Sequence, residues 1–117
     1  MPIQRIERVN ELIKREVSRI ILQDIEFPQD TLVTVTRVDG SLNLIEAKVF
    51  VSVMPEEKFE QVFKIINSQI FDIQQQINKN LKMRPVPKII FRMEKATSQA
   101  DRIEKLLEEI KPDLIEK

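Results

Sequence analysis

The chain has 117 residues, of which 42% are hydrophobic and 32% charged, and its formal net charge is zero. This composition is typical of one soluble domain with one core, and neutrality excludes an indiscriminate polyanion binder. Histidine and cysteine are absent and there is one glycine, which excludes imidazole and thiol catalysis, Cys/His metal sites and glycine-rich phosphate loops. We therefore expect a cytoplasmic protein that is not an enzyme, with no metal, no other cofactor and no membrane-spanning segment.

Residues 2–22 are predicted to form an amphipathic helix, because apolar side chains recur there at steps of three and four. The stripe consists of Ile6, Val9, Ile13, Val17 and Ile20. Arg8, Lys14 and Arg15 lie outside the stripe. Two interpretations of these bases stay open: a solvated face that pairs with nearby glutamates, or a set of phosphate contacts.

A β-hairpin is predicted next. Residues 32–38 are rich in Val and Thr, and residues 47–54 alternate between apolar and other side chains, as half-buried strands do. The only glycine, Gly40, lies between them in Asp39-Gly40-Ser41, where we expect a turn that needs a positive φ. A lone hairpin is marginally stable in water, so this one must pack against helices.

A long striped helix is predicted over roughly residues 56–82, followed by a third strand over 89–93. A straight helix of this length would measure about 40 Å, longer than such a domain is wide, so we expect a bend around Ser68–Phe71. Pro85 and Pro87 end the helix. Between Asp72 and Glu94 there are five bases and no acid.

A last helix is predicted over 98–110, opened by a possible capping box at Ser98 and Asp101 and followed by a short polar tail from about 111. The whole chain, 1–117, is then a single α+β domain: a three-stranded sheet with helices on one face. The third strand follows a long helix, so it is expected to cross back and pair with a hairpin strand.

Several stretches together resemble the ribosome-binding factor A family, in the right order over nearly the whole chain. They are residues 5–16, the strand pair 33–38 and 47–52, the run Leu81-Lys82-Met83-Arg84-Pro85-Val86-Pro87-Lys88-Ile89-Ile90-Phe91, and Arg102-Ile103 with Leu106-Leu107. The resemblance implies a type II KH-like fold of order αββα(α)βα. It also implies a non-catalytic factor, without cofactor, that binds the free small ribosomal subunit and its rRNA to assist late maturation, notably in the cold.

The chain departs from this family at the helix kink. The family's alanine-x-glycine kink aligns here with Gln69-Ile70-Phe71, which lacks both small residues. A close approach of phosphate to this backbone is therefore not expected, and the departure predicts a straighter helix than in the relatives. An aspartate usual in the hairpin turn is Asn43 here, which makes similar turns.

The RNA-facing surface is therefore expected to rest on side chains of the long helix and its exit. Besides the three bases of the first helix, the candidates are Lys64, Gln74, Lys79, Lys82, Arg84, Lys88 and Arg92. Arg84 is the foremost of these, because a guanidinium can hold a phosphate through two hydrogen bonds. Most phenylalanines have core spacing, with Phe71 the one to examine for base stacking.

The partners expected are the small subunit and its rRNA, with no membrane and no small-molecule substrate, and the protein is expected to be a monomer. The alternative is a protein–protein adaptor or homodimeric module whose bases only keep it soluble. Salt separates the two, because phosphate contacts weaken with ionic strength and apolar contacts do not.

Overall fold

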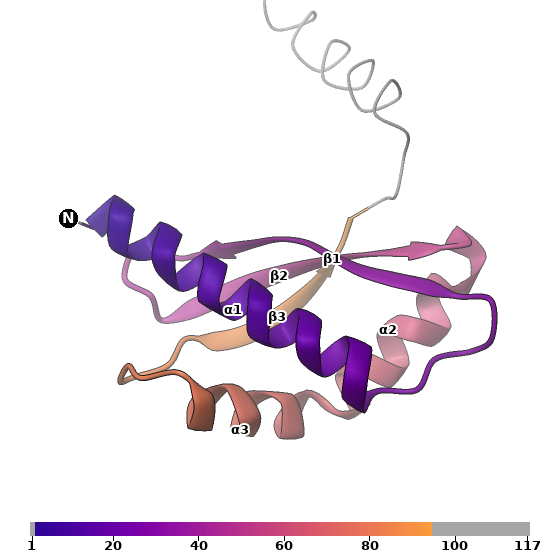
Figure 1. Cartoon of the computed structure of the whole chain (residues 1–117). Coiled ribbons are helices and arrows are strands. Elements are labelled where there is room, and N and C mark those ends of the chain that lie inside the picture. Colours follow the sequence, from indigo (N-terminus) through magenta and orange to yellow (C-terminus); the bar gives the residue numbers. More distant parts are fainter. Residues whose placement is uncertain (1, 95–117) are drawn as a thin grey trace, which may run out of the picture.

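The structure of the protein is a computed structural model, and it describes residues 2–94 (Figure 1). The elements are, in order, α1 (Pro2–Asp24), β1 (Leu32–Gly40), β2 (Glu46–Met54), a short 3-10 helix (Glu56–Lys58), α2 (Phe59–Ser68), α3 (Ile70–Asn80) and β3 (Lys88–Met93). The predicted helix over 98–110 and the tail from 111 lie outside the described residues. No helix within 2–94 is long and apolar enough to cross a membrane.

The sheet has the order β1-β2-β3 and is mixed. β1 and β2 form the predicted hairpin and pair antiparallel, and β3 pairs parallel to β2. A parallel neighbour needs a crossover, which α2 and α3 supply between β2 and β3. The predicted return of the third strand to a hairpin strand is therefore confirmed, and its partner is β2.

One face of the sheet carries the core. Alternate residues of β2 and β3 (Ala47, Val49, Val51, Val53, Ile89 and Phe91) are at most 3% exposed. They meet the stripe of α1, all five members of which are buried as predicted. The opposite face carries exposed charged side chains, among them Lys48 and Arg92. The expected α+β domain with helices on one face is confirmed.

Gly40 does not have the role that the sequence predicted. It is the last residue of β1 and has no positive φ, and the left-handed residue of the β1–β2 loop is instead Leu44, with φ 56°. The Gly40 N–H donates to Asn10 Oδ1 at 2.9 Å, and a Cβ on residue 40 would lie 2.8 Å from that same oxygen. Gly40 therefore gives room to the side chain of Asn10 and does not supply a turn with positive φ.

The predicted single helix over 56–82 is two α-helices. α2 ends at Ser68 and α3 starts at Ile70, so the break falls within the stretch expected to bend. Gln69, between them, has φ −111° and ψ 12°, near the bridge region that residues with a side chain can adopt. The Ser68 hydroxyl also donates to the Ile65 carbonyl at 2.6 Å, a bond that bends helices. Small residues are therefore not needed for this break.

Candidate nucleic-acid interface

Residues 82–88, hereafter the basic turn, connect α3 to β3. The helix stops because Leu81 is extended, with φ −87° and ψ 135°, while its side chain stays buried in the core. The chain then reaches β3 through Pro85 and the buried Pro87. The sequence had predicted a helix that includes Lys82. In the structure, Lys82 lies just beyond the end of α3.

The basic turn is held on both sides by hydrogen bonds. Gln74 of α3 donates from Nε2 to the Pro87 carbonyl at 3.1 Å and accepts from the Ile89 N–H at 2.8 Å. The Lys88 N–H donates to the Ile45 carbonyl of the β1–β2 loop at 2.9 Å. These bonds fix the end of the basic turn that enters β3, so this part of its backbone is well defined.

Gln74 therefore has a structural part in this surface. Its amide nitrogen also donates to Asn78 Oδ1 at 3.0 Å, so both polar atoms of its side chain are engaged within the protein. The sequence placed Gln74 among the RNA contacts. The geometry makes it the residue that positions the basic turn, and we leave it out of the interface.

Lys82, Arg84 and Lys88 are all exposed. The two ion pairs found within residues 2–94 join Arg19 to Glu16 and Arg37 to Glu94, so no carboxylate of that part of the chain forms an ion pair with the basic turn, and Glu46 is the register neighbour of Lys88. Lys82 and Arg84 are two residues apart, and like charges without an ion-pair partner repel one another, which lowers stability. A polyanion would remove that repulsion.

Arg84 is turned partly onto its own backbone. Its Nη1 donates to the Met83 carbonyl at 2.6 Å and to the Leu81 carbonyl at 3.2 Å. These bonds fix the guanidinium over the end of α3 while the residue as a whole stays exposed. A fixed guanidinium loses less side-chain entropy when it binds a phosphate.

Helix α1 contacts α3, the helix that leads into the basic turn. Asn80 Nδ2 donates to Glu16 Oε1 at 3.0 Å, and Glu16 also pairs with Arg19 at 3.0 Å. Burial raises the pKa of Glu16, but the hydrogen bonds from Asn80 and Arg19 and the charges of Arg19 and Arg15 outweigh it, so the pKa lies below its ordinary value. Glu16 is therefore a carboxylate that joins the two helices.

The predicted bases of α1 are not all alike. Arg8 and Arg15 are exposed. Lys14 is half-buried and lines a shallow groove between α1 and β1 together with Glu7 and Glu11. The carboxylates around Lys14 support the solvated interpretation for that lysine, whereas Arg8 and Arg15 stay candidates for phosphate contacts.

The other predicted contacts divide by position. Lys79 is exposed in the last turn of α3, next to the basic turn. Lys64 is exposed on α2, beside the stacked rings of Phe59 and Phe63, whose centroids are 5.1 Å apart. Figure 1 shows α2 and the basic turn at opposite ends of the molecule, so Lys64 does not join the other bases. Phe71, at the helix break, is 71% exposed.

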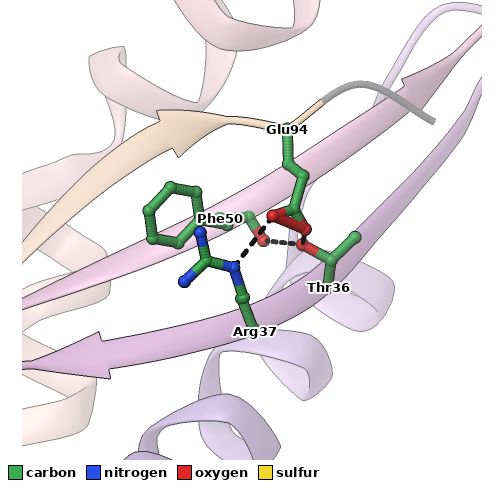
Figure 2. A network of polar contacts seen from close by, with 4 residues as sticks. All are labelled: Thr36, Arg37, Phe50 and Glu94. Carbon is green, nitrogen blue, oxygen red and sulfur yellow. Dashed lines mark hydrogen bonds and ion pairs between the residues drawn. The ribbon is translucent and has the colours of Figure 1, made fainter. Parts of the chain in front are cut away.

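Arg92 lies on the open face of the sheet, opposite Phe50 in the β2–β3 register. The best-defined polar cluster of that face is shown in Figure 2. Arg37 Nε donates to Glu94 Oε1 at 2.9 Å, and its guanidinium carbon lies 3.8 Å from the centre of the Phe50 ring. Thr36, the extra residue where the β1–β2 register shifts, donates to the other Glu94 carboxylate oxygen. The positive charge of Arg37 is therefore paired with Glu94 and lies against the ring of Phe50.

Arg5 is a base that the sequence analysis did not single out as an RNA contact. It lines an open hollow together with Met83 and Pro85 of the basic turn. Arg5 is far from this turn in the sequence, and no local pattern indicates that the first turn of α1 reaches it.

The fold and the site together define a class of protein. Within residues 2–94, a parallel β3 follows two short helices, and the helices cover one face of the sheet, which is the arrangement of a KH-like α+β domain. The crystal structure of ribosome-binding factor A from Thermus thermophilus has the same fold: its TM-score is 0.65 at 23% identity, over 75% of this chain and 93% of that one.

The chain belongs to the ribosome-binding factor A family. Residues 5–107 match the family model described as "Ribosome-binding factor A". A ribosome-binding factor A from Bdellovibrio bacteriovorus is 35% identical over 108 residues, which are 92% of this chain and 81% of the relative. One from Thermodesulfovibrio yellowstonii is 36% identical over 110 residues, 94% of this chain and 93% of the relative. The resemblance found in the sequence is confirmed.

Proposed function

We propose that this protein binds the free small ribosomal subunit through its rRNA and assists late maturation of that subunit, particularly in the cold. It acts in the cytoplasm as a monomer, without a catalytic step or a cofactor. The observation that carries the proposal is the basic turn, in which Lys82, Arg84 and Lys88 are exposed without a carboxylate partner within residues 2–94. Membership of the ribosome-binding factor A family supports the ribosome as the site of action.

The binding mode follows from the kind of contacts available. Lysine and arginine bind phosphate oxygens and position a protein on RNA without reading its sequence. Structured RNA is recognised largely by shape and backbone contacts of this kind. Arg8, Arg15, Lys79, Lys82 and Arg84 lie on α1, on α3 and on the turn after α3, and we assign them to a surface that follows a folded rRNA backbone. Lys88 alternates with the buried Ile89 of β3, so its side chain faces the open side of the sheet.

Co-sedimentation with isolated small subunits over a salt series tests the proposal. We expect binding that weakens steeply between about 50 and 200 mM salt, as phosphate contacts do. Arg84→Glu should weaken binding at every salt concentration. Lys64→Glu, which reverses a positive charge on α2 at the other end of the molecule, is the control and should bind like the unaltered protein.

The rival interpretation, a protein–protein adaptor, gives the opposite result. Apolar interfaces are insensitive to moderate salt. Binding that ignores both the salt concentration and Arg84→Glu would therefore remove the RNA proposal. The proposed role in the cold is tested separately, by asking whether cells without this protein accumulate immature small subunits more strongly at low temperature.

A further inference from the structure

The hollow beside the basic turn is a surface for which the proposed phosphate contacts give no role. Three segments that are distant in sequence meet there: the first turns of α1, the β1–β2 loop and residues 83–85. Its volume is about 470 Å³, within the range of about 300–1,000 Å³ of pockets that hold small ligands. Figure 1 shows the three segments at the same end of the molecule.

The hollow combines apolar walls with polar groups. Leu42, Met83 and Pro85 line it, and Leu42 is 84% exposed. Arg5 and Asn43 line it as well. The contacts of the Asn43 side chain within residues 2–94 use only its oxygen, which accepts from the Ser41 hydroxyl at 2.7 Å and the Ile45 N–H at 3.2 Å. Its amide nitrogen is left to donate to a ligand.

Both sides of the hollow are preformed. The β1–β2 loop is closed by the Ser41 N–H, which donates to the Glu46 carbonyl at 2.9 Å, and by the Leu44 N–H, which donates to the Ser41 carbonyl at 2.9 Å. The Ile45 carbonyl accepts from the Lys88 N–H and so ties this loop to the basic turn. A site that is already ordered loses little entropy when a ligand enters.

The positive charge around the hollow indicates which kind of ligand it can bind. None of its lining residues is acidic, Arg5 is among them, and Lys82 and Arg84 are the sequence neighbours of Met83. The occupant must therefore offer a flat apolar surface to Leu42 and Met83, an acceptor to Asn43, and negative charge to the bases. A nucleotide with an unstacked base offers all three, whereas the bases of a double helix are stacked on one another and cannot enter.

We propose that this hollow binds one unpaired nucleotide of single-stranded RNA, with its base against Leu42 and Met83 and its phosphate on Arg5. The inference rests on the proposed function and sharpens it. The rRNA that this protein recognises would include a single-stranded segment next to the backbone bound by the basic turn.

An NMR titration of the ¹⁵N-labelled full chain tests the inference directly, with hexauridylate as the single-stranded probe and a short RNA duplex as the comparison. Hexauridylate should shift the amide signals of residues 42–45 and of Met83, and the duplex should not. Leu42→Ala should weaken hexauridylate binding about fivefold, because it removes apolar surface that the base would cover. Leu22→Ala is the matched control, because Leu22 is also 84% exposed but lies on α1 away from the hollow.

Three results would overturn the inference: equal effects of Leu42→Ala and Leu22→Ala, equal shifts of the hollow amides by the duplex, or shifts produced by an amphipathic leucine-rich peptide and not by hexauridylate. The last result would assign the hollow to a protein partner. Co-sedimentation keeps this test separate from the proposed function. Salt-sensitive binding of the small subunit without shifts in the hollow rejects only the nucleotide site, whereas loss of subunit binding in the unaltered protein rejects the function itself.

Discussion

The basic turn and the open face of the sheet both carry arginines, and they treat these charges in opposite ways. On the sheet, Arg37 pairs with Glu94 and covers the ring of Phe50. In the basic turn, Arg84 bonds only to two backbone carbonyls, and its neighbours Lys82 and Lys88 have no carboxylate partner within residues 2–94. The first arginine stabilises the fold, and the second is the one that we propose to bind a phosphate.

The comparison shows that a count of charges cannot locate a binding surface. The chain is neutral overall, with 19 bases and 19 acids, yet its charges are balanced in one region and unbalanced in another. A surface for a polyanion is expected where basic side chains are held in place and have no acidic side chain as a partner. Four changes test this distinction, from the largest expected effect to the smallest.

Gln74→Ala should have the largest effect, because it releases the support of the basic turn. It leaves the Ile89 N–H and the Pro87 carbonyl without their partner, which should lower the free energy of unfolding by about 1–3 kcal/mol. Binding of small subunits should also fall, although the polar atoms of the Gln74 side chain are hydrogen-bonded within the protein. Urea unfolding measures the first effect, and Gln75→Ala, an exposed neighbour on the same helix, is the control. An unchanged unfolding midpoint would contradict the positioning role.

Neutralising the basic turn should affect binding alone. Lys82→Gln with Arg84→Gln should weaken small-subunit binding about tenfold at low salt and reduce the slope of log K against log salt by about 2, one for each phosphate contact. The thermal midpoint should stay the same or rise, because repulsion is relieved. A normal slope in this double variant would show that these bases do not touch phosphate.

Arg37→Ala should give the reverse pattern. It removes a cation–π contact and a partly exposed ion pair, which together contribute about 1 kcal/mol. The thermal midpoint should fall and small-subunit binding should not change. Lys48→Ala, on the same face of the sheet, is the control for the loss of one positive charge. If Arg37→Ala weakened binding as much as the neutralised basic turn does, the distinction between the two regions would be lost.

Glu16 should give the smallest effect, and it depends on pH. Its pKa is lowered in the folded protein, so its stabilising contribution is present above the pKa of the unfolded chain and is lost as the pH falls through the folded pKa. Glu16→Gln should therefore be less stable than the unaltered protein at neutral pH, by under about 1 kcal/mol, and the difference should vanish in acid. Urea unfolding at neutral and at acid pH measures it, with Glu11→Gln as control. A difference that persists unchanged in acid would point to packing and not to the charge.

The sequence by itself determined the elements and the class of fold. The period of the apolar residues in α1 and the alternation in β2 depend on which side chains must be buried, and burial is a property that local spacing reveals. The bases of residues 82–88 were also visible, because the lack of acids there is a local feature. The place of the helix break could be predicted from length alone.

Only the tertiary structure decided how these parts are used. Gly40 donates a hydrogen bond to Asn10, thirty residues earlier, and Gln74 supports the basic turn because β3 returns beside α3. The hollow exists because the β1–β2 loop, the start of α1 and the basic turn meet at one end. Contacts between residues far apart in the chain depend on how the elements pack, and the spacing of residues along the chain carries no record of that packing.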